Sequence, residues 1–366
     1  MTVFFRTLTF AGLCLLAACT PHSAIILYPE AAAVGQVHQV FVGTTRGVDN
    51  KGKLNNTRNE QLTYHRYDIS VPPRHKIGSI EWPRFKPDPT KNFLTTAIDH
   101  FPAAADFKTE LAKAIKNQPK NKREVVLYVH GFNTTFAEGM YRLAQLSADM
   151  ELAYPIVHYS WPSAGSPLGY AYDRDSQLFG RDGLEHLLNT IMDSGADRVL
   201  LVAHSMGALL AVETMRQMAI SEAGLLQKTI SGVVLISPDI DVELFRRQAA
   251  KIGNLPQPFV IFSSKEDRAL RLSARLTGKI ERLGNIKDLD DISDLDVTVM
   301  DVTKFSQGSS SHFVAATSPA LIEILKKINR VDAAFQNDPS GKTGIVSGAI
   351  LSVKQATKVI LSPVTP

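Results

Sequence analysis

The sequence predicts an α/β fold in which helices cover both faces of a mostly parallel central sheet, preceded by antiparallel strands. Two observations predict this fold. From about residue 107 onward, short apolar segments alternate with segments whose apolar residues recur at helical spacing, which is typical of parallel strands connected by helices. The segments 125–129 and 199–202 are also almost continuously apolar, as expected of strands that are buried on both faces.

The expected antiparallel strands lie on the N-terminal side of this region. The segment 37–43 is rich in β-branched residues and is followed by a polar loop that extends through Asn59. The segment 67–71 alternates in polarity before two prolines, and 77–82 gives another short strand before a proline-rich stretch. We expect these strands to lead into the parallel sheet.

The parallel part is expected to alternate strands with helices. The expected strands are 125–129, 155–161, 199–203, 232–237, 259–263 and 297–302. The expected helices carry apolar stripes at Phe136, Met140 and Leu143, at Leu184, Leu187, Leu188 and Ile191, within 207–218, and at Leu321, Leu325 and Ile328. The last helix begins at Ser318-Pro319, because serine caps a helix N-terminus and proline suits the first helical position.

Composition indicates one large domain with an ordinary hydrophobic core. The chain has 366 residues, of which 44% are hydrophobic, and its two cysteines are Cys14 and Cys19. If both lie outside the folded domain, that domain has no disulfide, thiol nucleophile or cysteine-ligated metal. The formal net charge of +4 is mild and its basic residues are unclustered, so we expect no nucleic-acid partner. No metal or cofactor is predicted.

The N-terminal residues resemble the leader of a bacterial lipoprotein. Arg6 precedes an apolar run, 8–17, that is too short to span a bilayer. The sequence Leu-Ala-Ala-Cys at 16–19 resembles the lipobox, the site at which such leaders are cut and lipidated. The alternative is an ordinary secretory signal in which the cysteine occurs by chance.

This resemblance implies a lipid-anchored protein of the bacterial cell envelope. It implies that a signal peptide, 1–18, is removed, that Cys19 carries the fatty acyl chains, and that 19–36 is a tether. Thr20 follows the cysteine in place of aspartate, which implies sorting to the outer membrane on its periplasmic side.

The expected domain boundaries are 37–330 for the α/β domain and 331–366 for a C-terminal extension. Within the extension, the segment 344–361 is predicted to be a peripheral helix or strand. The alternative is a helix lying on a membrane, which Lys354 and Lys358 support poorly because they make a weak basic face.

A nucleophile motif occurs at Ala203-His204-Ser205-Met206-Gly207, a variant of the G-x-S-x-G turn of α/β-hydrolases. Small residues are needed two positions on either side of the serine, because strand and helix backbones approach closely there. A buried strand precedes the motif and a helix follows it, which would expose the hydroxyl at the carboxyl end of the sheet. The sequence therefore predicts Ser205 as the nucleophile.

The oxyanion hole of this fold is built from two backbone N–H groups. One comes from the residue after the nucleophile, here Met206, and the other from a loop after an earlier strand. Here that loop is His130-Gly131-Phe132-Asn133, so Phe132 is the second predicted donor. We expect His130 to be structural.

The order of residues in this fold is serine, acid, histidine. His312 is the single histidine after Ser205, in a serine-rich loop before the last helix, and is therefore the predicted general base. Asp267, after the strand at 259–263, is the preferred acid. Asp239 and Asp241, one strand earlier, remain alternatives.

Further segments resemble a bacterial α/β-hydrolase family of unknown function over about residues 37–330. They are Val42-Gly43-Thr44-Thr45-Arg46, Ser160-Trp161-Pro162-Ser163, Tyr172-Asp173-Arg174-Asp175-Ser176, Ser237-Pro238-Asp239-Ile240-Asp241 and Ser311-His312-Phe313, together with the serine turn. The resemblance implies the fold and a Ser-His-Asp triad, but no physiological substrate. Ala203 in place of the first glycine and the C-terminal extension are departures from the pattern.

The loop 163–177 should border the cleft because it leaves the carboxyl end of a strand. Tyr170 and Tyr172 are candidate substrate-pocket residues; the alternative is that they pack against the loop backbone. Asp173, Arg174 and Asp175 are expected to form a local ion-pair network rather than to be catalysts.

Three functions follow from these observations. The first is hydrolysis of a small-molecule or lipid carboxylic ester through an acyl-enzyme. The second is acyl transfer to an alcohol or amine with the same residues. The third is a non-catalytic envelope scaffold that keeps the hydrolase fold, because fold alone does not imply activity. The sequence does not predict the oligomeric state.

Overall fold

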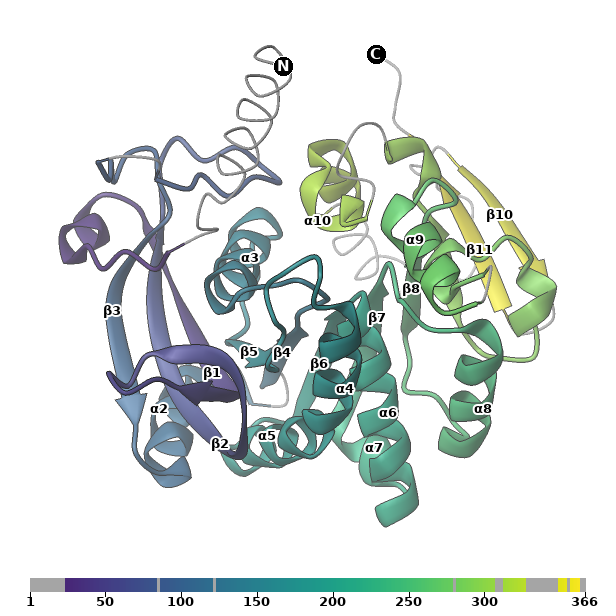
Figure 1. Ribbon diagram of the computed structural model, residues 1–366, viewed down its shortest axis with the longest axis horizontal. Coiled ribbons are helices and arrows are strands. Elements are labelled where there is room, and N and C mark those ends of the chain that lie inside the picture. The colour runs from purple at the N-terminus through teal and green to yellow at the C-terminus, as the bar shows by residue number, and fades with distance from the viewer. Residues whose placement is uncertain are drawn as a thin grey trace, which may run out of the picture.

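The computed structural model describes residues 24–83, 86–120, 123–278, 281–306, 312–326, 348–353 and 356–362. Within these residues one mixed sheet of 11 strands runs through the molecule (Figure 1), in the order β10-β11-β9-β8-β7-β6-β4-β5-β1-β2-β3. The predicted signal peptide and Cys19 lie outside the described residues.

Three long antiparallel strands form one side of the sheet: β1 (Gln36–Val48), β2 (Leu54–Val71) and β3 (Leu94–Phe101). The polar loop expected through Asn59 is wrong in extent, because β1 and β2 pair as far as Val48 and Leu54. The strand expected at 77–82 is also wrong. Gly78 has a φ of +83° there, and Glu81 is hydrogen-bonded to His75, so the segment is an irregular loop.

The central strands are parallel and connected by helices. They are β4 (Glu124–Val129), β5 (Ile156–Ser160), β6 (Arg198–His204), β7 (Ile230–Ile236), β8 (Phe259–Ser263) and β9 (Thr298–Asp301). β5 also pairs in parallel with β1, which joins the two parts of the sheet. All six lie within two residues of the segments predicted from apolar character, since strands buried on both faces have a clear apolar signal.

The helices are α2 (Ala104–Lys116), α3 (Phe136–Asp149), α4 (Tyr170–Phe179), α5 (Arg181–Asp193), α6 (Met206–Ser221), α7 (Leu225–Thr229), α8 (Val242–Ile252), α9 (Arg268–Leu276) and α10 (Val314–Thr317). Short 3-10 helices are η1 (Pro29–Ala33), η2 (Leu283–Asn285), η3 (Leu289–Ile292) and η4 (Thr303–Phe305). Helix backbone also follows at 319–326, where Leu321 is buried and its N–H donates to Ser318 Oγ at 3.4 Å. Ile328, predicted on this helix, lies outside the described residues.

Helices cover both faces of the sheet, as predicted (Figure 1). On one face, Val125 and Leu127 of β4 share a core with α2, α5, α6 and α8. On the other face, Val126 and Tyr128 of the same strand pack with α3. The alternation of side chains along a strand therefore divides the apolar residues of β4 between two cores. The predicted fold class is confirmed.

The C-terminal segment extends the sheet. β11 (Ala356–Leu361) is parallel to β9, and β10 (Gly348–Val353) is antiparallel to β11. Ala356 and Leu361 are buried, and Lys358 forms an ion pair with Asp301 of β9 at 3.3 Å. Of the alternatives left by the sequence, the described part of 344–361 is therefore strand.

Candidate active site

Ser205 lies on a strained turn between β6 and α6. Its φ of +53° and ψ of −121° are unusual for a residue with a side chain, and its N–H donates to the Ile236 carbonyl at 3.0 Å. A Cβ added to Gly207 would lie 2.2 Å from the carbonyl oxygen of His130. The second small residue of the motif is therefore required by close contact between backbones.

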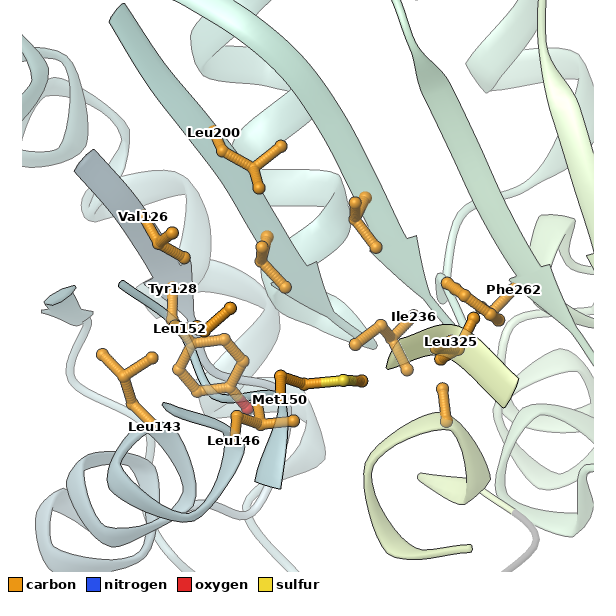
Figure 2. Close-up of a pocket in the computed structure, with 13 residues that line it drawn as sticks. Val126, Tyr128, Leu143, Leu146, Met150, Leu152, Leu200, Ile236, Phe262 and Leu325 are labelled. Carbon is orange, nitrogen blue, oxygen red and sulfur yellow. The ribbon is translucent and has the colours of Figure 1, made fainter. Parts of the chain in front are cut away.

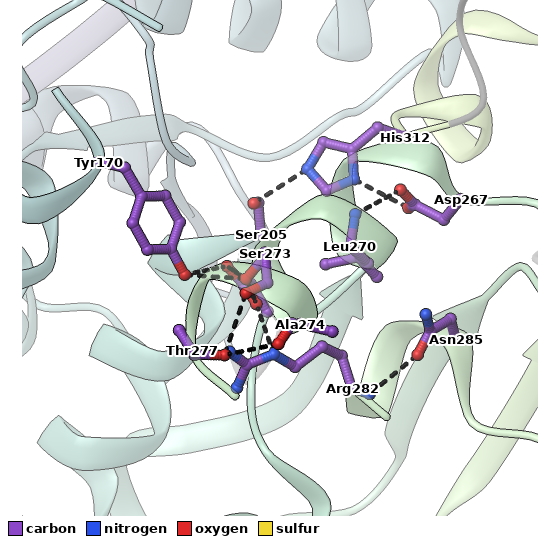
Figure 3. Close-up of polar contacts among 11 residues, drawn as sticks. Tyr170, Ser205, Asp267, Leu270, Ser273, Ala274, Thr277, Arg282, Asn285 and His312 are labelled. Atoms are coloured by element: carbon purple, nitrogen blue, oxygen red, sulfur yellow. Dashed lines mark hydrogen bonds and ion pairs between the residues drawn. The ribbon is translucent and has the colours of Figure 1, made fainter. Parts of the chain in front are cut away.

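His312 contacts both of its predicted partners (Figure 3). Its Nε2 lies 2.9 Å from Ser205 Oγ and its Nδ1 lies 2.8 Å from Asp267 Oδ2. The histidine side chain is 26% exposed, whereas that of Asp267 is 0% exposed. A buried carboxylate on Nδ1 favours the tautomer whose Nε2 can accept the serine proton.

Asp267 is fixed by the helix that it begins. It is the N-cap of α9, and its Oδ1 accepts the Leu270 N–H at 3.0 Å while Oδ2 faces His312. Each carboxylate oxygen thus has a separate partner. The cap fixes the side-chain rotamer, and so the position of the oxygen that holds the imidazole.

The two alternative acids have other partners. Asp239 accepts from Ser273 Oγ at 2.6 and 2.7 Å and lies 3.2 Å from the Nε of buried Arg282. Asp241 caps α8 through the Leu244 N–H at 3.1 Å. The structure brings Asp267, and neither of these carboxylates, to the imidazole of His312.

The predicted oxyanion donors flank the nucleophile. Gly131 lets the loop approach, because a Cβ there would lie 2.8 Å from the Cβ of Ser205 and 2.6 Å from Nδ1 of His204. Among the described residues, the N–H groups of Phe132 and Met206 have no hydrogen-bond partner. Both are therefore free to donate to an oxygen bound at Ser205.

His130 has a structural environment, in line with the expectation. Its ring stacks on Trp161 with centroids 4.8 Å apart, its Nε2 lies 3.0 Å from the Trp161 carbonyl, and Trp161 Nε1 donates to the His130 carbonyl at 2.7 Å. Burial lowers the pKa of His130 well below its usual value, so the ring is neutral.

His204 forms a hydrogen bond to the backbone of His312, a role that sequence reasoning missed. Its Nε2 lies 3.4 Å from the carbonyl oxygen of His312, and its ring packs 4.0 Å from that of Phe313. Burial lowers the pKa of His204 well below its usual value, so a neutral ring donates to that carbonyl. The residue before the serine varies in the general motif, which is why the motif did not identify it.

A polar pocket of about 170 Å³ lies beside Met206. It is lined by Tyr170, Arg174, Gln177, Met206, Leu209, Asp239, Asp241, Leu244, Thr277 and Arg282. The Tyr170 hydroxyl is 2.8 Å from Ser273 Oγ (Figure 3). The Tyr170 ring also makes an edge contact with Phe132. Tyr172 does not line this pocket: its hydroxyl donates to the Asn56 carbonyl at 2.8 Å.

A second cavity, of about 170 Å³, is apolar and separate from the site (Figure 2). It lies between the sheet and α3, where it is lined by residues such as Val126, Leu143 and Leu200. None of Ser205, His312 or Asp267 lines it. In the part of the chain that the structure describes, no group of three or more His, Cys, Asp or Glu side chains is arranged to hold a metal ion.

Three solved structures similar to this chain are hydrolases of low sequence identity. A CIB-like hydrolase from Thermoplasma acidophilum is 16% identical, with a TM-score of 0.37, over 58% of this chain and 89% of that chain. An esterase from Pyrococcus furiosus is 11% identical, with a TM-score of 0.34, over 87% and 96%. An esterase from Pyrobaculum calidifontis is 11% identical, with a TM-score of 0.37, over 84% and 88%.

No curated protein matches the chain. A family model described as "alpha/beta hydrolase of unknown function (DUF900)" matches residues 103–329, which is more than half of the chain. The match contains Ser205, Asp267 and His312 as well as the 130–134 loop. The chain therefore belongs to this family of alpha/beta hydrolases.

Proposed function

We propose that this protein is a serine hydrolase that cleaves carboxylic esters through an acyl-enzyme, with Ser205, His312 and Asp267 as its catalytic triad. The observation that carries the proposal is the continuous chain from Ser205 Oγ to His312 Nε2 (2.9 Å) and from His312 Nδ1 to Asp267 Oδ2 (2.8 Å). These lengths are those of hydrogen bonds through which a proton can move.

In the proposed mechanism His312 removes the serine proton as Oγ attacks the ester carbonyl. Negative charge develops on the former carbonyl oxygen and is stabilised by the N–H groups of Phe132 and Met206. The imidazolium, held by Asp267, then protonates the leaving alcohol, and the acyl group remains on the serine. Water, activated by the same histidine, releases the acid and restores the free enzyme.

The polar pocket beside Met206 favours short esters that carry polar groups as the substrates of this protein. Arg174, Gln177 and Thr277 place hydrogen-bonding groups on its walls, and its volume is about 170 Å³. A long alkyl chain would take water away from Arg174 and Gln177 without replacing its hydrogen bonds, which costs binding energy. The polar pocket is lined by Met206, the residue that follows Ser205, whereas the apolar cavity of Figure 2 is lined neither by Met206 nor by a triad residue.

The proposal is tested on p-nitrophenyl esters of graded chain length. We expect the wild-type chain to hydrolyse acetate and butyrate esters and Ser205→Ala to lose this activity by at least about 1000-fold. Ser221→Ala, at the exposed end of α6, is the matched control and should retain full activity. Equal rates for Ser205→Ala and wild type would reject the proposal, and product analysis with added alcohols separates hydrolysis from acyl transfer.

We also propose that Cys19 carries a lipid anchor that holds the domain at the bacterial envelope, on the periplasmic side of the outer membrane. The sequence at 16–19 supports this. No helix within the described residues is long and apolar enough to cross a bilayer.

Expressed in a Gram-negative host, the chain should incorporate radiolabelled palmitate and fractionate with membranes. Cys19→Ser should abolish both and Cys14→Ser should abolish neither; unchanged labelling of Cys19→Ser would reject the anchor.

A further inference from the structure

Two fully buried charged side chains, Arg46 and Asp173, lie behind the loop that carries the proposed oxyanion donor. Arg46 comes from β1 and Asp173 from α4, and each is 0% exposed. They belong to two of the segments by which the sequence resembles its family, and neither takes part in the triad. Ser163, from a third such segment, lies between them.

Asp173 binds two separate loops through one carboxylate. Its Oδ2 accepts the backbone N–H of Asn133 at 3.1 Å and the hydroxyl of Ser163 at 2.6 Å. Its Oδ1 accepts the backbone N–H of Ala164 at 2.6 Å. The carboxylate therefore fixes the residue that directly follows Phe132.

Arg46 contacts the same loop one residue further along, at Thr134. Its Nη2 donates to the Thr134 carbonyl at 2.9 Å, and its Nη1 donates to the Ser163 carbonyl at 2.9 Å. Its Nε donates to Ser160 Oγ at 2.9 Å. The Thr134 N–H in turn donates to Ser163 Oγ at 3.2 Å, so Ser163 joins the two charged groups to the loop.

The fixed segment includes a residue in the left-handed region. Asn133 has a φ of +53°, in the left-handed region, and its N–H and the Thr134 carbonyl are both held by buried charges. Phe132, the proposed oxyanion donor, is the residue immediately before it. A donor of this kind stabilises the transition state only when its N–H is aimed in advance at the developing charge.

Burying the charged groups of Arg46 and Asp173 costs free energy, and both groups form hydrogen bonds to this loop. Burial lowers the pKa of Arg46 to about 10 and raises the pKa of the Asp173 carboxyl. Arg46 and Asp173 form no direct ion pair with each other. Each instead forms a hydrogen bond to the backbone of the 130–134 loop. Apolar residues would usually stabilise a core at lower cost, so this arrangement is better explained by precise placement of the loop.

We propose that Arg46 and Asp173 are positioning residues that aim the Phe132 N–H into the oxyanion hole. The proposal rests on the proposed hydrolase function and deepens it. Neither side chain touches the substrate; both act through the backbone at Asn133 and Thr134. Their loss should therefore weaken binding of the transition state more than binding of the ester itself.

The test is Asp173→Asn, which keeps the size of the side chain but turns an N–H₂ group either toward the Ala164 N–H or toward both the Asn133 N–H and the Ser163 hydroxyl. We expect kcat on a short p-nitrophenyl ester to fall about 10- to 100-fold, with KM changed less than about threefold. The affinity for a trifluoromethyl ketone, which mimics the tetrahedral intermediate, should fall by the same factor as kcat/KM. A merely structural defect would not produce this parallel loss.

Tyr159→Phe is the matched control. Its hydroxyl makes two buried hydrogen bonds in the same region, to Thr45 Oγ1 at 3.0 Å and to the Gly180 carbonyl at 2.5 Å, and none to the 130–134 loop. It should lose stability but keep kcat and inhibitor affinity. If Asp173→Asn fails to fold, Ser163→Ala provides a milder variant, with an expected loss in kcat of about 3- to 10-fold.

The outcomes separate this proposal from the one on which it rests. If wild-type protein neither hydrolyses esters nor reacts with a fluorophosphonate at Ser205, the hydrolase function fails. If wild type is active and folded Asp173→Asn or Ser163→Ala keeps wild-type kcat and inhibitor affinity, the positioning role is wrong. A rise in KM alone would also overturn it, because that result places the residues in substrate binding.

Discussion

The choice of acid depends on how single carboxylates are held. Asp267 and Asp239 both follow buried strands and both are buried, but only the first faces the imidazole. Asp239 is instead neutralised by Arg282 and accepts from Ser273. The sequence identifies Ser205 and His312 by their position in the chain order. It leaves the acid open, because the direction of each side chain depends on contacts made by distant residues.

The account predicts unequal effects of removing the two acids. Asp267→Asn should lower kcat by at least about 100-fold, because the amide no longer favours the productive histidine tautomer. Asp239→Asn, the matched control, should lower kcat by less than about fivefold, with its main effects on KM and stability. Both are measured as kcat and KM on one short ester near pH 8. A larger loss of kcat for Asp239→Asn than for Asp267→Asn would show that Asp267 is not the triad acid.

The turn from β6 to α6 shows which features of an element can be predicted. Its apolar strand and small flanking residues identify it, and the strained φ of Ser205 follows from that motif. The antiparallel side was less predictable. β3, Leu94–Phe101, mixes polar and apolar residues, whereas 77–82 looks like a strand but is held as a loop by contacts of His75 and Gly78. Tertiary contacts override a weak local pattern there.

At this turn the two small residues should respond differently to substitution. Gly207→Ala should abolish activity and lower the free energy of unfolding by about 2 kcal/mol or more, since its Cβ would clash with the His130 carbonyl. Ala203→Gly should remain active and cost only about 1 kcal/mol from added backbone freedom in a strand. Urea denaturation and the ester assay measure both. A stable, active Gly207→Ala would show that the turn is looser than described.

For the whole molecule, buried neutral histidines link stability to pH. Among the described residues, burial lowers the pKa of five histidines: His38, His65, His130, His158 and His204. Burial lowers the pKa of His65 to about 4, with a further contribution from the nearby ring of His100, and lowers that of His158 to about 3. The unfolded chain therefore binds protons near pH 6.5 that the folded chain does not bind.

Stability should accordingly be constant above about pH 7 and fall between about pH 6.5 and pH 4, by on the order of 3 kcal/mol for a histidine whose pKa in the folded chain is about 4 or lower. His75 opposes this: burial lowers its pKa, but its hydrogen bonds to Asp149 and Glu81 raise it overall. Urea denaturation at pH 7.5 and pH 5 measures the balance, and His65→Gln should reduce the difference. Equal stability at the two pH values, or greater stability at pH 5, would contradict the prediction.

The central claim, that Ser205 is an activated nucleophile, is tested most directly by mass spectrometry of the folded chain after brief exposure to a fluorophosphonate. The account predicts a single phosphonyl adduct, located on Ser205, absent from Ser205→Ala and formed much more slowly in His312→Gln. An unlabelled wild-type chain, or an adduct that forms at the same rate without His312, would contradict it.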